Sequence, residues 1–336
     1  MKPALIAKIV ILLCILSLII GFFNIDKDTL YGMSEVNSNS KNIITNANKI
    51  AVIELEGVIA SSYENNFFSV EASASNLLKS LKTAALDNNI KGVIIKINSP
   101  GGTVAMSQSI YNEIIELRKT KPVIAVFDDV AASGGYYIAS AADRIIAQSG
   151  TLTGSIGVIF SFMDYHNLLS DKLNINPVVI KSGKYKDIGS GTRAMTEEER
   201  NLMQDIINDS YSQFIEAITA GRINRQDTYT AQKTELTPQT LRENADGRVF
   251  TGRQASKLGF VDCLGGMDVA QNMIEKMAQE KFNNSLSVKL INYNKKASIA
   301  EYFSDFTEYG SKSNFKLTDF IPKSMLLNKR PLYLWE

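Results

Sequence analysis

The chain has 336 residues, of which 45% are hydrophobic and 21% charged, enough for one large or two ordinary domains with a buried core. Its 36 Lys and Arg residues nearly balance 35 Asp and Glu residues, which argues against nucleic-acid binding, a function that usually needs a basic surplus. The two cysteines, Cys14 and Cys263, lie far apart without metal-site spacing, so we expect neither a disulfide framework nor a metal site.

The chain opens with an apolar segment. Residues 9–23 carry no charge, and Lys8 alone interrupts the apolar run from Ala4 to Phe23; about 20 such residues cross a bilayer. Lys2 and Lys8 predict a cytoplasmic N-terminus, with everything after Asn24 on the other side. We interpret residues 1–24 as a transmembrane anchor, with a cleaved signal peptide as the alternative. Residues 25–48 are rich in Asn and Ser and predict a flexible tether.

From Lys49 on, short apolar runs alternate with segments of helical spacing. The runs predict strands over residues 50–59, 92–97, 122–127, 144–148, 155–160 and 177–181. The helical spacing predicts helices over residues 71–87, 103–120, 134–142, 196–222 and 266–280, with a short helix from Thr237. Thr196 and Glu199 form the pattern of a capping box. This alternation favours an α/β fold with a mostly parallel sheet flanked by helices.

Three polar or glycine-rich sequences follow predicted strands. They are Asn98-Ser99-Pro100-Gly101-Gly102, Ser133-Gly134-Gly135 and Ser182-Gly183-Lys184-Tyr185-Lys186-Asp187. In open α/β sheets, ligands bind outside the carboxyl ends of the strands. We therefore expect all three sequences to lie near one edge of the sheet.

Ser133 is a candidate nucleophile, and a serine hydroxyl needs a base to take its proton. The single histidine, His166, is one candidate base, but it falls in a predicted surface helix where Asp164 would face another way. A lysine can serve instead, because burial disfavours the cation and lowers a pKa of about 10.4 by several units. Lys184 and Lys186 both fit a Ser-Lys dyad, and the residues alone leave open which acts, or whether both are solvated loop cations.

An acyl-transfer site also needs two backbone N–H donors aimed at one point. Gly134 directly follows Ser133, and Gly101 follows the predicted strand over 92–97. Glycine allows close approach of a ligand to the backbone. Both glycines are candidates for these donors, and the alternative is that they only mark turns.

Five motifs in order resemble the signal peptide peptidase A family. They are INSPGG, DDVAASGGYYIASAAD, GTLTGSIGVI, IKSGKYKDIGS and GRVFTGRQASKLGFVDCLGG, and the match runs from about Lys49 to Glu280. Members of that family are membrane-anchored serine peptidases of the Clp protease/crotonase fold. The single N-terminal span and the length resemble the short, unduplicated form.

The resemblance implies a role for each matching residue. Ser133 would be the nucleophile, and Lys186, which precedes Asp in the family's YKD position, would be the general base in place of Lys184. Gly101 and Gly134 would supply the oxyanion hole, and Ser155 would hydrogen-bond the lysine. The resemblance implies no cofactor and no metal. It also implies that serine and lysine meet across a subunit interface in a ring-like homo-oligomer, an octamer.

The implied activity is hydrolysis of remnant signal peptides and other short unfolded peptides through an acyl-enzyme. The peptidase domain would span residues 49–280 on the extracytoplasmic side of the cell membrane, and the role of residues 281–336 stays open. Three alternatives remain. A stomatin-directed membrane protease of the same fold would usually have further membrane spans downstream. A non-catalytic ring-forming membrane scaffold would leave the serine and lysine unexplained, and a crotonase-type acyl-CoA enzyme would not need Ser133.

Overall fold

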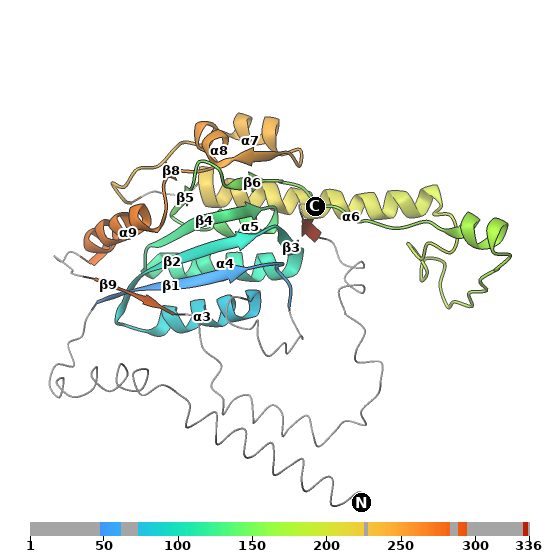
Figure 1. The fold of residues 1–336 in the computed structure, drawn as a ribbon, viewed down its shortest axis with the longest axis horizontal. Coiled ribbons are helices and arrows are strands. Elements are labelled where there is room, and N and C mark those ends of the chain that lie inside the picture. Colours follow the sequence, from blue (N-terminus) through green and yellow to red (C-terminus); the bar gives the residue numbers. More distant parts are fainter. Residues whose placement is uncertain (1–47, 62–72, 225–227, 283–287, 294–331, 335–336) are drawn as a thin grey trace, which may run out of the picture. The chain divides into compact units, whose positions relative to one another are not determined.

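A computed structural model describes residues 48–61, 73–224, 228–282, 288–293 and 332–334 of the chain (Figure 1). The predicted anchor over 1–24 lies outside these residues, as does the predicted tether apart from its last residue. Among the residues described, no helix combines the length and apolar character that crossing a bilayer requires.

The centre of the fold is a mostly parallel sheet. Over the described residues it has eight strands: β1 (Lys49–Glu56), β2 (Ile90–Ser99), β4 (Val123–Ala132), β5 (Arg144–Ala147), β6 (Leu152–Gly154), β7 (Val249–Thr251), β8 (Cys263–Leu264) and β9 (Lys289–Asn292). The order is β7-β6-β4-β2-β1-β9, with β5 pairing β4 and β8. Of these pairings only β6 with β7 is antiparallel. The predicted α/β class is thus confirmed.

Helices cover both faces of this sheet (Figure 1). On one face, α3 (Ala74–Leu86) and α4 (Val104–Thr120) bury Leu77, Leu81 and Ile110 in the main core. On the other face, α9 (Met267–Phe282) packs Ile274 in a second cluster with Ile94. Strands covered on both sides read as continuous apolar runs, which is why β-branched stretches such as residues 92–97 predict β2 well.

Shorter helices complete the domain. They are α5 (Gly134–Ala139), α7 (Pro238–Asn244) and α8 (Gly252–Leu258), with π-helical turns η1 (Leu168–Lys172) and η2 (Thr219–Ile223). The long α6 (Glu197–Ile218) begins at the predicted capping box: Thr196 accepts from the Glu199 N–H, and Glu199 accepts from the Thr196 N–H. We call residues 160–196, which precede α6, the arm. Within the described residues, hydrogen bonds of the arm run to the arm itself and to the first turn of α6.

Two predicted strands are wrong. Residues 155–160 follow β6 and form no strand; Ile156 is buried, but its carbonyl accepts from Gly247 N–H of a loop and not from a sheet ladder. Residues 177–181 lie in the arm without regular structure, and Val178 and Ile180 are 87% and 97% exposed. Residues 177–181 are therefore apolar although they are not buried in the sheet of the same chain.

The chain beyond residue 280 also contributes to the domain. The predicted boundary falls inside α9, and β9 then joins the edge of the sheet beside β1. Near the C-terminus, β10 (Leu332–Leu334) pairs antiparallel with β3 (Gly101–Thr103). The predicted C-terminal extension over residues 281–336 therefore adds strand β9 to the sheet and strand β10 to the Gly101-Gly102 segment.

Candidate active site

Ser133 occupies a strained turn between β4 and α5. Its backbone has φ 52° and ψ −116°, a conformation that costs a non-glycine residue roughly 1–3 kcal/mol. The turn is fixed on both sides, because the Ser133 N–H donates to Gly154 O at 2.8 Å and its carbonyl accepts from the Tyr137 N–H at 2.8 Å. The side chain is buried, and among the described residues its Oγ has no hydrogen-bond partner. A strained strand-to-helix turn with an unengaged hydroxyl is the geometry of a nucleophile elbow.

Gly134, the residue after Ser133, packs tightly against the Gly101-Gly102 segment. A Cβ on Gly134 would lie 2.7 Å from Ser107 Oγ and 3.1 Å from the amide nitrogen of Gly102. Only a residue without a side chain fits this gap. The backbone of Gly134, directly after Ser133, is therefore in close contact with the amide of Gly102.

The role of Gly101 as an oxyanion donor stays a prediction, and its backbone groups have other partners in the structure. Its N–H donates to Ser99 Oγ at 3.1 Å, and its carbonyl accepts from the Ile59 N–H at 2.8 Å. Because successive residues of a strand direct their backbone groups to opposite edges, Gly102 faces the other edge, where it pairs with Tyr333 of β10. Gly102 thus presents its amide to the edge that β10 pairs with, close to Gly134. The sequence alone does not distinguish adjacent glycines, because the choice depends on the strand pairing.

Ser155 lies one residue from the contact that fixes Ser133. It follows Gly154, whose carbonyl bonds the Ser133 N–H, and it also has a positive φ of 48°. Its own N–H donates to Arg248 O at 2.8 Å. The structure therefore brings Ser133, Gly134, Gly102 and Ser155 together at the carboxyl ends of β4, β2 and β6.

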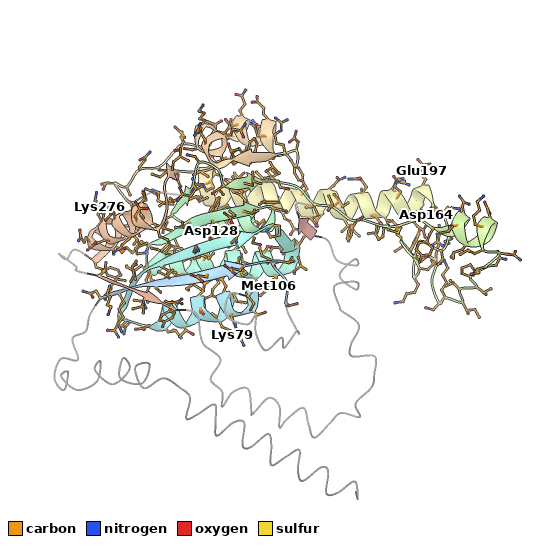
Figure 2. All side chains as sticks on the ribbon, viewed as in Figure 1. Lys79, Met106, Asp128, Asp164, Glu197 and Lys276 are labelled. Carbon is orange, nitrogen blue, oxygen red and sulfur yellow. The ribbon has the colours of Figure 1, made fainter. Side chains whose placement is uncertain are left out.

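Lys186 is not brought to Ser133 within one chain. It is exposed on the arm, and its neighbours Lys184 and Tyr185 hydrogen-bond Glu198 in the first turn of α6. Figure 2 shows Asp164 of the arm and Glu197 of α6 at the same end of the view, away from Asp128 of the sheet. The opposite end of α6 packs on the domain, where the ring of Phe214 lies 5.0 Å from that of Tyr137 in α5. Phe214 comes 16 positions after Glu198, which corresponds to about 24 Å of helix.

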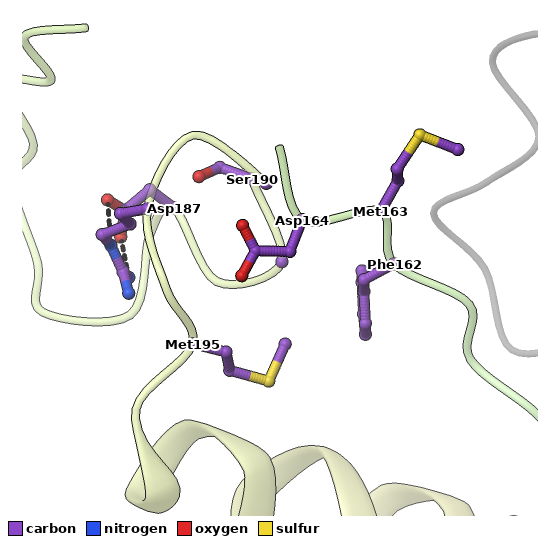
Figure 3. A pocket seen from close by; sticks show the side chains of 9 residues that line it. Phe162, Met163, Asp164, Asp187, Ser190 and Met195 are labelled. Carbon is purple, nitrogen blue, oxygen red and sulfur yellow. Dashed lines mark hydrogen bonds and ion pairs between the residues drawn. The ribbon is translucent and has the colours of Figure 1, made fainter. Parts of the chain in front are cut away.

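An ion-pair network orders the loop that carries Lys186. Arg193 donates to Asp187 at 2.7 and 3.0 Å and to Glu199 at 2.5 and 2.8 Å. Lys181 donates to the same Asp187 carboxylate at 2.5 Å. These bonds hold the pKa of Asp187 well below its ordinary range and that of Glu199 at about 2. Asp187 and Arg193 also line a small pocket of the arm, drawn in Figure 3 with the Asp187 contacts as dashed lines.

The two other candidate bases are also on the arm. Lys184 pairs with Glu198, which raises the pKa of the lysine and favours its cation. His166 lies 2.5 Å, Nδ1 to Oδ1, from Asp164, so the expectation that Asp164 faces away from it is wrong. Asp164 sits in the loop before the helical turn and not on the helix, which lets its carboxylate reach back.

One edge of the Gly101-Gly102 segment pairs with an extended strand. Leu332, Tyr333 and Leu334 pair with Thr103, Gly102 and Gly101 in antiparallel register. Strand addition of this kind is a recurring mode of peptide recognition. The edge beside Ser133 is thus able to bind a peptide backbone in extended form.

Comparisons with known proteins match the chain to peptidases. The family model described as peptidase family S49 matches residues 115–281, and the one described as Clp protease matches residues 65–149. A Synechocystis sp. protein named "Putative protease" is 40% identical over 230 residues, covering 68% of this chain and 74% of the relative. An Enterococcus faecium protein named "Putative signal peptide peptidase SppA" is 34% identical, covering 84% and 74%. The chloroplastic serine protease SPPA of Arabidopsis thaliana is 34% identical over 64% of this chain and 30% of its own length.

Proposed function

Because the chain belongs to peptidase family S49 and is a serine peptidase with a Clp protease-like domain, we propose that it is a membrane-anchored endopeptidase that degrades remnant signal peptides and other short unfolded peptides. Its nucleophile is Ser133 of one copy, and its general base is Lys186 of a neighbouring copy. The observation that carries this proposal is the buried Ser133 Oγ, which has no partner among the described residues and directly precedes Gly134, where the backbone packs on the Gly101-Gly102 segment.

In the first step, the neutral amine of Lys186 takes the Ser133 hydroxyl proton as Oγ attacks the scissile carbonyl carbon. The carbonyl oxygen becomes an oxyanion, which the N–H groups of Gly102 and Gly134 stabilise; loss of one such donor typically costs about 10²–10³ in rate. The lysine then gives its proton to the leaving amine as the C–N bond breaks. The product is an acyl-enzyme ester on Ser133 and a free amino terminus.

In the second step, water attacks the ester carbonyl and the same lysine takes a proton from that water. Collapse of the second oxyanion breaks the bond to Oγ, and the proton returns to Ser133. The lysine must be uncharged in both steps, so a hydroxyl ligand suits it better than a carboxylate. Ser155, which lies beside the Ser133 turn, is the proposed hydroxyl partner.

A second copy is needed to complete this site. α6 holds the arm about 24 Å from the helix end that packs near Ser133. The arm also exposes apolar side chains, among them Val178 and Ile180, whose exposed fractions are 87% and 97%. Clustered exposed apolar side chains mark surfaces that bind another molecule. Contact with a neighbouring domain would bury these residues and bring Lys186 to a Ser133 that lacks a base.

The proposed substrates suit a site that binds backbone by strand pairing. An edge strand such as β3 recognises extended peptides through main-chain hydrogen bonds, so it accepts many sequences but not folded domains. Remnant signal peptides are short, apolar and left in the membrane, where an anchored peptidase meets them. We expect a synthetic apolar signal-peptide remnant in lipid vesicles to be consumed faster than a polar peptide of equal length, and equal rates would count against this substrate class.

The decisive experiment is complementation between two inactive variants. Ser133→Ala keeps Lys186, and Lys186→Ala keeps Ser133, so a mixed assembly regains sites where the two intact residues meet. Random mixing of equal amounts should restore about a quarter of the sites in a head-to-tail ring. Each variant alone should cleave a fluorogenic peptide at background rate. If the mixture stays at background although the two chains co-assemble, the two-copy site is wrong.

Lys184→Ala and His166→Ala are the matched controls for the base. Both remove a titratable group from the same arm, and Lys184 is two residues from Lys186. Near wild-type kcat is expected for both at alkaline pH, where the base is neutral in every variant. A His166→Ala variant without activity, together with an active Lys186→Ala variant, would instead assign the base to the His166–Asp164 pair.

A further inference from the structure

We propose that Arg193 is a positioning residue for Lys186. It fixes the loop that carries the lysine and neutralises the two carboxylates that would otherwise hold this amine in its charged form. The inference rests on the proposed function, because it gives Arg193 a purpose only if Lys186 is the base.

Arg193 joins the loop to the helix. Its guanidinium makes two bonds to Asp187, the residue after Lys186, and two to Glu199 in the first turn of α6. Paired hydrogen bonds to a carboxylate fix orientation as well as distance. The side chains of Asp187 and Glu199 are 10% and 3% exposed, so these bonds are shielded from solvent, unlike most surface ion pairs.

Apart from the side-chain contacts of Lys181, Lys184 and Tyr185, the loop around Lys186 has only weak local structure. It consists of turns closed by single backbone bonds at 3.1–3.2 Å: Lys186 N–H to Gly183 O, Ile188 N–H to Tyr185 O, and Ser190 N–H to Asp187 O. Gly191, which closes the pocket, has φ +72°, and a Cβ there would lie 2.1 Å from Met163 O. Asp187 anchored on Arg193 therefore ties these turns to α6 next to the contacts that Lys184 and Tyr185 make with Glu198.

Arg193 also affects the charge around Lys186. A carboxylate near an amine favours the ammonium form, and a general base must be neutral. Three carboxylates that the structure places around this loop have partners: Glu198 contacts Lys184 and Tyr185, Asp164 contacts His166, and Asp187 contacts Lys181. Arg193 serves both Asp187 and Glu199. Its removal leaves Glu199 with its backbone and Thr196 contacts but without a cation, and Asp187 with Lys181 alone.

The test compares three variants of the full chain. Arg193→Gln removes the positive charge and the paired hydrogen bonds of the guanidinium. Arg193→Lys keeps the charge without the paired geometry. The double variant Arg193→Gln/Asp187→Asn removes both members of the Arg193–Asp187 ion pair. The readouts are kcat and kcat/KM for a fluorogenic peptide from pH 5 to 10, with melting temperature and assembly size as checks on folding.

We expect Arg193→Gln to lower kcat at least about tenfold, because the reacting amine is misplaced. In its profile of kcat against pH, the rise on the acid side, or acid limb, should move to higher pH by about 0.5–1 unit. The reason is that uncompensated carboxylates favour the ammonium ion of Lys186. The double variant should return the limb toward that of the wild-type enzyme without restoring kcat. Arg193→Lys should keep the wild-type limb with a smaller loss of kcat.

An acid limb that stays in place in Arg193→Gln, whatever its kcat, overturns the inference, because a merely structural side chain would not act on the protonation of the base. The proposed function fails separately. If Lys186→Ala retains wild-type kcat/KM, the base assignment is wrong; if Lys186→Ala is inactive while Arg193→Gln matches the wild type in rate and pH profile, only the role of Arg193 is wrong.

Discussion

The backbone of Ser133 adopts a conformation that L-residues rarely occupy, and the structure shows what enforces it. The flanking bonds from Gly154 and Tyr137 come from β6 and α5, so two separate elements hold one turn. Such over-determined strain concentrates at functional sites. Ser155 also has a positive φ, of 48°. The two serines each follow one member of the last β4–β6 pair, Ala132 and Gly154.

At the same scale, Gly134→Ala should separate catalysis from folding. A Cβ at this position lies 3.1 Å from the Gly102 nitrogen and fills the space between the two amides. We expect kcat to fall by about 10²–10³, the typical effect of losing an oxyanion donor. Steady-state kinetics and a melting curve measure the two effects. Gly150→Ala, whose Cβ would meet nothing within 4 Å, is the control; equal activity of Gly134→Ala and the control would remove Gly134 from the site.

Sequence reasoning reaches Ser133, Gly134 and Ser155 but not the choice between Gly101 and Gly102. A small residue after an apolar strand is visible in the sequence. The direction of an amide within a two-glycine strand is not, because it depends on the pairing with Ile59, more than 40 residues earlier. The Asp164–His166 contact was missed for a similar reason: a helix boundary displaced by a few residues decides whether one side chain reaches the next.

At the scale of elements, periodicity predicts what one chain buries within itself. It places β2, β4, β5, α4 and α9 close to their observed bounds. It fails at residues 177–181, where the pattern of a buried strand belongs to an exposed stretch of the arm. An apolar run indicates that something covers it, and the pattern cannot distinguish a covering element of the same chain from a second chain.

Because the apolar stretch over residues 177–181 is exposed, we expect Ile180→Asp to weaken assembly without unfolding the domain. Ile180 is 97% exposed and belongs to an arm that makes no hydrogen bond to the sheet among the described residues. A buried unpaired carboxylate strongly opposes association. Sedimentation velocity should show smaller species and lower peptidase activity at an unchanged melting temperature. Leu86→Asp, an 84% exposed site on α3, should change neither; if both variants assemble like the wild type, Ile180 is not at the interface.

For the whole molecule, the two halves of the proposed site lie at opposite ends of α6, and each lacks what the other carries. The domain holds a nucleophile with oxyanion donors, and the arm holds amines with their compensating carboxylates. Such an arrangement makes activity depend on assembly, so an isolated chain would carry no working peptidase. The same chain also pairs its own β10 with the edge where a substrate backbone would bind.

The pairing of β10 predicts that ending the chain after Pro331 increases apparent substrate affinity. A site filled by its own strand for part of the time has its apparent affinity reduced by the fraction that is free. KM for a short fluorogenic peptide should therefore fall, while kcat stays the same because Ser133 and Lys186 are untouched. A chain ending after Leu334 keeps β10 and serves as the control. A synthetic peptide with the sequence of residues 330–336 should compete with substrate in the shortened chain, and an unchanged KM together with no competition would mean that β10 and substrate use different edges.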